Sequence, residues 1–198
     1  MSRYEIHLTV SADADDEKLR SWAAGSGVKF TRILLDSGVT ADQPMLSWLT
    51  DGTPGEAESA ARHTAATLTG DGFPVTRLKV EAAASGRDAP GTAAEAGSRY
   101  FEHHVKLLLP AGTDLEPVRA VATRHDARLS RNARRVRADG VRERFVTQRC
   151  YRAGRPQAAA ALAGLLADLT GAGWEVAEVE EEFVLVDDNP ALDDGWFV

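Results

Sequence analysis

The sequence predicts an α+β fold made of two similar halves, and three observations lead to this prediction. The stretch LTGDGFPVTRLKVE at 68–81 recurs as LTGAGWEVAEVEEE at 169–182, at an offset of 101 residues. The stretch YEIHLTV at 4–10 recurs as FEHHVKL at 101–107, at an offset of 97. Each half also alternates between strand-like and helix-like patterns in the same order. A nearly constant offset along the chain indicates an internal duplication.

In the first half, apolar and polar residues alternate over 4–10, which predicts a strand. A helix follows over 11–27, because Ser and Asp precede it, acids fill its first turn and glycines lie at its end. Two strands are expected next, over 29–36 and 45–50. A second helix over 54–72 ends at glycine. A strand over 75–81 completes the half.

The second half repeats this order, with strands expected over 101–109, 127–135, 144–151 and 176–186 and helices over 110–126 and 155–173. The order β-α-β-β-α-β is that of the ferredoxin-like unit. We therefore expect two tandem ferredoxin-like repeats, over 1–81 and 100–186, packed as a pseudo-twofold pair around a shared cleft. Residues 82–99 are rich in Ala, Gly and Ser and predict a flexible linker. Residues 187–198 form a C-terminal tail, in which Trp196 and Phe197 indicate docking.

The composition excludes several classes of protein. The net charge of −7 argues against general nucleic-acid binding. No apolar run approaches the ~20 residues that span a bilayer, and the first residues lack the layout of a secretory signal. Cys150 is the single cysteine, which excludes a disulfide scaffold and a cysteine-rich zinc site. We expect a cytoplasmic protein, monomeric or homodimeric, and its 19 arginines against 4 lysines are typical of a GC-rich bacterial genome.

Charge is distributed unevenly along the chain. Residues 119–155 contain twelve arginines and three acids, whereas residues 175–194 contain nine acids and no base. Two explanations remain open at this point. The two regions form strands that pair by opposite charge, or the arginines line an anion-binding face that the acids partly neutralise.

Side chains alternate along a strand, so each predicted strand has one face toward the helices and one open face. On the first strand the apolar set faces the helices, which leaves Glu5, His7 and Thr9 on the open face. The repeat then places Glu102, His104 and Lys106 on the open face of the second half. The other residues expected there are Leu46, Trp48, Thr50, Arg77, Lys79, Thr147, Arg149, Tyr151, Glu178, Glu180 and Glu182. Because charged side chains avoid a dry core, we expect the two open faces to enclose a wet cleft.

The segment His7-Leu8-Thr9-Val10 resembles the His-x-Thr-x motif of the two-histidine phosphoesterase superfamily. Members have two ferredoxin-like lobes, each of which contributes one motif to a central cleft. The resemblance implies that His7 and His104 form the acid–base pair and that Thr9 holds a phosphate. Lys106 stands where the family has Thr or Ser, and lysine binds phosphate as a point charge.

A metal site is the alternative. Glu5, His7, Glu102 and His104 supply two carboxylates and two imidazoles, and residues at i and i+2 reach the same ion from one strand face. Such a set suits divalent Fe, Mn, Ni or Zn. The layout is similar to that of the vicinal-oxygen-chelate enzymes, although their modules run β-α-β-β-β. Glu102-x-His104-x-Lys106 is also similar to the Glu-x-Glu-x-Lys strand of the triphosphate tunnel enzymes, which implies polyphosphate binding with a divalent metal.

The sequence thus predicts a protein whose cleft binds a small anionic or phosphorylated ligand. If the protein is an enzyme, we expect a phosphoesterase-like hydrolase that needs no cofactor. The catalytic residues are His7 and His104. The expected ligand-binding residues are Thr9, Lys106, Arg149, Trp48, Tyr151, Arg32 and Arg131. The metal-dependent enzyme remains the alternative. A non-catalytic ligand-binding or interaction module also remains, in which the Glu-x-His residues pair with arginines across the interface.

Overall fold

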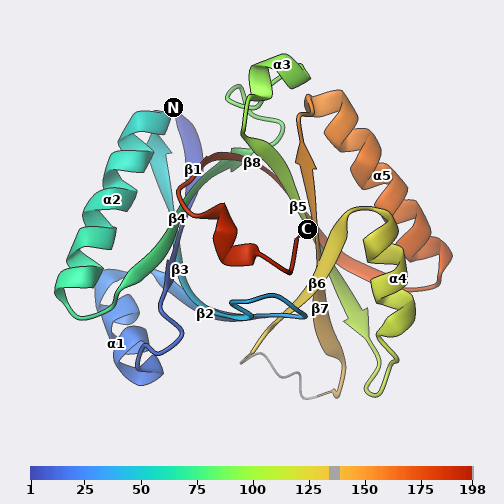
Figure 1. Cartoon of the computed structure of the whole chain (residues 1–198), viewed down its shortest axis with the longest axis horizontal. Coiled ribbons are helices and arrows are strands. Elements are labelled where there is room, and N and C mark those ends of the chain that lie inside the picture. Colours follow the sequence, from blue (N-terminus) through green and yellow to red (C-terminus); the bar gives the residue numbers. More distant parts are fainter. Residues whose placement is uncertain (134–138, 198) are drawn as a thin grey trace.

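The computed structural model describes residues 1–133 and 139–197, and it confirms an α+β fold (Figure 1). The first half contains β1 (Ser2–Val10), α1 (Asp16–Ser26), β2 (Lys29–Leu35), β3 (Asp42–Gly52), α2 (Pro54–Gly70) and β4 (Val75–Ala83). The second half contains β5 (Tyr100–Leu109), α4 (Glu116–Arg124), β6 (Ala127–Asn132), β7 (Arg142–Tyr151), α5 (Arg155–Gly171) and β8 (Glu175–Asp187). Two short elements complete the chain, the helix α3 (Ala93–Ala96) and the 3-10 helix η1 (Pro190–Asp193).

Most element boundaries follow local signals in the sequence. Thr53 and Glu56 form a capping box at the start of α2, and Pro54 occupies its first turn. The predicted helix over 110–126 begins only at Glu116, because Pro110 and Thr113 form a turn in which the Thr113 N–H donates to the Pro110 carbonyl. The predicted strand over 127–135 ends at Asn132, and its last two positions lie outside the described residues.

The eight strands of the described residues form one closed antiparallel barrel in the order β1-β3-β2-β6-β7-β5-β8-β4, and β4 pairs with β1 to close it. Within each half the order is ferredoxin-like, β4-β1-β3-β2 and β8-β5-β7-β6. The halves meet edge to edge, where β2 pairs with β6 and β4 pairs with β8. This corrects the expectation of two open faces packed over a cleft. In the closed barrel each edge strand of one half is paired with an edge strand of the other half.

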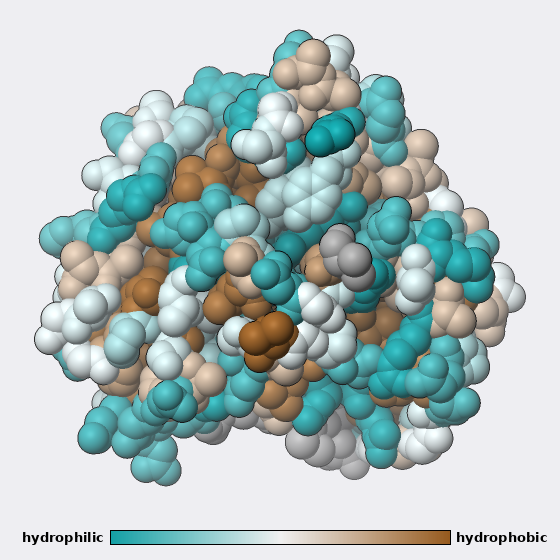
Figure 2. Space-filling model, viewed as in Figure 1, coloured by the Kyte–Doolittle hydropathy of each residue, from teal (hydrophilic) through white to brown (hydrophobic). Residues whose placement is uncertain are grey.

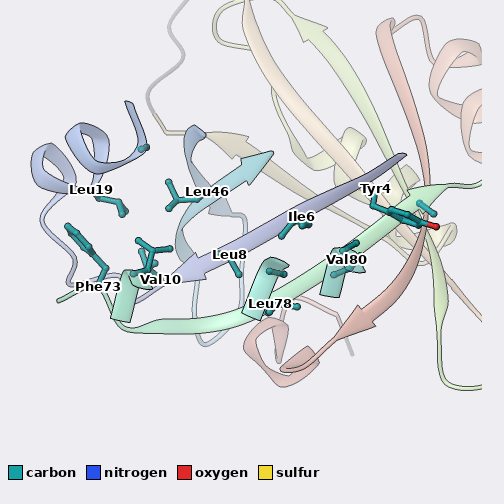
Figure 3. Close-up of a cluster of buried hydrophobic side chains, with 14 residues drawn as sticks. Tyr4, Ile6, Leu8, Val10, Leu19, Leu46, Phe73, Leu78 and Val80 are labelled. Atoms are coloured by element: carbon teal, nitrogen blue, oxygen red, sulfur yellow. The ribbon is translucent and has the colours of Figure 1, made fainter. Parts of the chain in front are cut away.

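The helices α1, α2, α4 and α5 lie outside the barrel and cover two separate apolar cores (Figure 1). Figure 3 shows the first core, where alternate side chains of β1 point to the same side as Leu46, Leu78 and Val80. The second core is built in the same way on β5, around Val105, Leu107 and Leu109. None of the helices in the described ranges is long and apolar enough to cross a membrane.

The faces of β3 are opposite to those predicted. Ile6 pairs with Trp48 and Leu8 pairs with Leu46, so both partners lie on the helix side, and Trp48 packs against the first core. Ser47 lies opposite His7 and therefore faces the barrel interior. A shift of one residue in the expected register moves every side chain of a strand to the other face.

The segment 84–99 is packed against the barrel and is not the flexible linker that we predicted over 82–99. Ala84 and Ala89 belong to a third buried cluster with Phe101 and Phe183. The Tyr4 hydroxyl donates to Asp88 at 2.9 Å. Small side chains, which made the segment look like a linker, are what permits this close packing.

The C-terminal tail docks, as Trp196 and Phe197 predicted. The tail begins after Asp187, which is the last residue of β8, and Figure 1 shows it turning back into the ring of strands. Trp196 is 5% exposed, and its indole N–H donates to the Leu129 carbonyl at 3.0 Å. Asn189 donates to the Thr76 carbonyl at 2.8 Å. The tail therefore contacts both halves of the barrel, and residue 198 lies outside the description.

The packing of segment 84–99 generates a prediction at Gly154. A Cβ at this position would lie 2.4 Å from the Gly91 carbonyl oxygen, so Gly154→Ala should lower the free energy of unfolding by about 1–3 kcal/mol. Gly55, near the start of α2, is the control, since a Cβ added there would have no atom within 4 Å and Gly55→Ala should be neutral or stabilising. Urea unfolding of both variants measures the difference. Equal stability of the two would show that segment 84–99 does not pack on Gly154.

Candidate functional site

One wall of the barrel interior carries most of the polar residues predicted for the site. It consists of the four adjacent strands β1, β4, β8 and β5. Glu5 lies opposite Glu81 on β4, and Glu102 lies opposite Glu182 on β8. The two Glu-x-His steps therefore both face the interior, as their alternation predicts, and four carboxylates converge there.

The two histidines contact carboxylates in similar ways. In His7, Nε2 lies 2.6 Å from Glu81 Oε2 and 3.7 Å from Glu5 Oε1. Its Nδ1 is buried and has no hydrogen-bond partner among the described residues. In His104, Nε2 lies 3.4 Å from Glu102 Oε1 and 3.5 Å from Glu182 Oε2. Its Nδ1 lies 3.0 Å from the hydroxyl of Thr147.

Glu182 connects the two Glu-x-His steps. Besides its contact with His104, it lies close to Glu5 and His7, and one ligand atom from each of these three residues lies within 4.8 Å of the others. Glu102 and His104, which we predicted to complete a four-residue metal set, do not belong to this group. The alternation of its strand predicts Glu182 on the open face, but the sequence does not identify it as a metal ligand or a catalytic residue. The offset of 101 residues that relates it to Glu81 is the signal that could have identified it.

Cations neutralise Glu102 and Glu81. The Glu102 carboxylate accepts from Lys79 on one oxygen and from Arg149 on the other, and Lys79 also contacts Glu81. Burial alone would raise the pKa of Glu102, but Arg149 and Lys79 hold it well below its usual range. Both carboxylates are therefore charged in the folded protein.

Glu182 is in the opposite situation. Burial raises its pKa well above the usual value, and the negative charges of Glu81, Glu5 and Glu102 raise it further, against the opposing effect of Lys79. The part of the interior near Glu5 and Glu182 is thus short of positive charge.

A second charged group lies where the tail enters the barrel. The Asp193 carboxylate accepts from Arg77 Nη1 at 2.7 Å, from Arg149 Nη2 at 2.6 Å and from Gln43 Nε2 at 2.9 Å. Arg77 is also bound to both oxygens of Asp187. A hollow of about 690 Å³ borders this group, and its lining includes Arg149, Asp193 and Tyr151. In the space-filling view, side chains fill the ring of strands, and many of those around it are hydrophilic (Figure 2).

Three further predicted ligand-binding residues lie on interior positions. Thr9 is buried opposite Arg77. Lys106 pairs with Glu178 at 3.1 Å. Tyr151 is half exposed beside Tyr100, with 4.8 Å between the ring centroids.

Arg32, Arg131 and Trp48 are not in the barrel interior, which corrects their assignment to the ligand-binding site. Arg32 binds Asp16 at 2.6 Å and Asp42 at 2.7 Å, and it thereby ties the start of α1 to the sheet. Arg131 is exposed and shares the outer face of its strand with Leu129, whereas Trp48 packs in the first core. Of the three arginines predicted to bind ligand, Arg32, Arg131 and Arg149, it is Arg149 that contacts a Glu-x-His step, through Glu102.

No family model matches the chain, and no curated protein matches its sequence. Among solved structures, the acetolactate synthase small subunit from Thermotoga maritima is similar at 12% identity and a TM-score of 0.32, over 94% of this chain and 96% of that one. A mutant chlorite dismutase from Candidatus Nitrospira defluvii is similar at 13% identity and a TM-score of 0.31, over 94% and 92% of the two chains. TM-scores of this size do not establish a shared function.

The buried pairing of Glu102 generates a test of the site's electrostatics. Arg149→Leu removes one cation from both Glu102 and Asp193, so it should lower the free energy of unfolding by about 3–5 kcal/mol. Adding Glu102→Gln should recover part of this loss, because it removes one of the unpaired charges. Arg131→Leu is the control and should stay within about 0.5 kcal/mol. Urea unfolding at pH 7 measures all three, and similar losses for Arg149→Leu and Arg131→Leu would contradict the assignment of inner and outer faces.

Proposed function

We propose that the chain binds a divalent metal ion inside the barrel, through Glu5, His7 and Glu182, and that this ion supports a metal-dependent reaction. The three ligand atoms lie within 4.8 Å of one another and come from two strands that are not neighbours. Two carboxylates and one imidazole form a ligand set that suits divalent Mn, Fe or Zn. The remaining coordination positions would be open to water or substrate.

The observation that carries this proposal is the position of Lys79, which lies between Glu81 and Glu102. We infer that the two repeats are related by a pseudo-twofold axis, which maps Glu5 onto Glu102 and Glu81 onto Glu182. The Lys79 ammonium bridges Glu81 and Glu102. The equivalent bridge, between Glu182 and Glu5, would have to come from position 180, which is a glutamate. One of the two related carboxylate pairs, Glu81 and Glu102, is therefore bridged by a lysine, whereas the pair Glu182 and Glu5 has a glutamate at the corresponding position.

Electrostatics around the proposed ligands agree with a bound cation. In the described part of the chain, the ion-pair contacts of Glu5 and Glu182 are with histidines and not with Lys or Arg. A divalent ion would neutralise both carboxylates and remove the repulsion that raises the pKa of Glu182.

Glu81 orients the proposed imidazole ligand. A proton on His7 Nε2 would be donated to Glu81 at 2.6 Å, and Nδ1, which has no hydrogen-bond partner among the described residues, would then carry the free lone pair of the ring. A carboxylate behind a metal-bound histidine fixes its tautomer and ring orientation in this way. Lys79 in turn contacts both Glu81 and Glu102, so the support of the site extends to β5 in the second half of the barrel.

His104 is placed to act on a ligand of the ion. Its Nε2 lies 3.5 Å from Glu182 Oε2, and Thr147 positions the ring from the other side. If an ion binds at Glu182, His104 would lie close enough to hold or accept a proton at Nε2 as a general acid or base. The phosphoesterase-like function predicted from His7 and His104 remains a prediction with weaker support, because the carboxylates beside both rings would repel a phosphate.

Metal binding is tested first on protein purified without a histidine tag. Elemental analysis and calorimetric titration with Mn²⁺ and Zn²⁺ should show one ion per chain, and Glu182→Gln should weaken the affinity by at least about 10-fold. Glu181→Gln is the control, since Glu181 is exposed on the opposite face of the same strand. Absence of bound metal, together with no thermal shift on adding Mn²⁺, Fe²⁺, Ni²⁺ or Zn²⁺, would contradict the proposal. Stabilisation by cyclic nucleotides instead would favour the phosphoesterase prediction.

A second variant tests the comparison with Lys79. Glu180→Lys places an ammonium where the pseudo-twofold axis predicts the metal ion. It should abolish metal binding and raise the melting temperature of the metal-free protein by about 2–4 °C, as about 1 kcal/mol does for a chain of this size. Calorimetry and thermal unfolding measure the two effects. If Glu180→Lys binds metal as tightly as the wild type, the inferred equivalence is wrong.

A further inference from the structure

We propose that Asp193 occupies a carboxylate-binding site of the barrel, and that a small-molecule carboxylate binds to the same donors when the tail withdraws. This inference does not depend on the metal site, because none of its residues is a proposed metal ligand. It rests on three observations: the donors to Asp193 lie on three strands of the barrel, both arginines also bind other carboxylates, and a hollow borders Asp193.

All three donors to Asp193 belong to the barrel. Gln43 lies on β3, Arg77 on β4 and Arg149 on β7, and each is more than nine-tenths buried. They approach the carboxylate from three strands, with two guanidinium donors on one oxygen and the amide on the other. Three buried donors that converge from separate strands form a built site for a carboxylate, and the tail supplies only the acceptor.

Each arginine keeps a carboxylate of its own when Asp193 leaves. Arg77 binds Asp187 through Nε and Nη2, and Arg149 binds Glu102 through Nε. The donors released by Asp193 are Nη1 of Arg77 and Nη2 of Arg149, so both guanidinium groups would stay in place and present one free N–H donor each. When Asp193 leaves, the two arginines therefore remain paired with Asp187 and Glu102. They are not left as uncompensated buried charges, and their free N–H groups keep the geometry of the carboxylate site.

Besides the bonds of Asp193, withdrawal of the tail would break a small set of contacts. The polar ones to the second half and to the β2–β3 loop are single hydrogen bonds, such as those from Trp196 to Leu129, from Arg128 to the Trp196 carbonyl and from Ser37 to the Gly195 carbonyl. The others include the burial of Trp196 and the cation–π contacts of Arg128 and Arg149 with Phe197. The hollow of about 690 Å³ also borders Asp193 directly, so a ligand can reach the carboxylate position from this side.

The charges nearby select a carboxylate over a dianion. Glu102 and Asp187 remain beside the two arginines, and a tetrahedral dianion such as phosphate would place a second negative charge among them. A planar monoanion reproduces the acceptor arrangement of Asp193 with a single charge. The chemical class that fits is therefore a small monocarboxylate.

The test uses acetate as the probe and Asp193→Ala as the variant, in the full chain. Thermal unfolding is followed over a series of sodium acetate concentrations, with sodium chloride added to constant ionic strength. The melting temperature of Asp193→Ala should rise with acetate and approach saturation, and the apparent dissociation constant should be at least about 10-fold lower than for the wild type, in which Asp193 competes. Asp194→Ala is the matched control and should behave like the wild type.

Two further measurements complete the test. Arg77→Met added to Asp193→Ala should remove the acetate response, and phosphate should produce less stabilisation than acetate. If Asp193→Ala does not fold, Asp193→Asn keeps the shape of the side chain and carries the same expectation. In the wild type, high acetate should shift the NMR signal of the Trp196 indole N–H, which reports its bond to Leu129. A folded variant without an acetate-specific response, or equal acetate affinity in wild type and variant, would overturn the proposal.

Discussion

The arrangement of this protein depends on neutralising charges that barrel closure removes from water. When the two halves join at both edges, the polar faces of β1, β4, β5 and β8 turn inward, and several of their acids and bases become almost completely buried. A buried charge is tolerated when it is paired and hydrogen-bonded. Glu102 meets this condition with Lys79 from β4 and Arg149 from β7, so a single carboxylate links three strands from both halves.

The same condition explains the place of the tail. Arg149 donates to both Glu102 and Asp193, and the Asp193 carboxylate also accepts from Arg77 and Gln43. Burial opposes the ionisation of Asp193, but Arg77 and Arg149 lower its pKa below the usual value. The tail is thus held in the barrel by its complementary charge as well as by Trp196. A segment that completes an internal charge network is also one that a ligand of the same chemistry can replace.

The two halves carry similar sets of polar residues, and the differences between them make the interior asymmetric. Lys79 lies between Glu81 and Glu102 and closes this network without any ligand. The position at the same offset in the second half is Glu180, and burial together with the negative charges of Glu81, Glu5 and Glu102 raises the pKa of Glu182. The interior therefore has a group of carboxylates and an imidazole at Glu5, His7 and Glu182 and, where the tail enters, a carboxylate that is bound by two arginines.

The sequence alone determined the α+β class, the order of elements in each half and the face on which both Glu-x-His steps lie, because alternation and capping signals are local properties of a strand or helix. The tertiary structure decided which strands are neighbours. Trp48 packs in the first core because it lies opposite Ile6 in the β1–β3 pair, whereas its alternation pattern predicts the open face, and Arg32 binds Asp16 outside the barrel. Glu182 lies beside Glu5 and His7 because β8 pairs with β4 when the barrel closes. Such contacts join residues from opposite ends of the chain, and their geometry comes from the closure of the whole sheet, which no local pattern encodes.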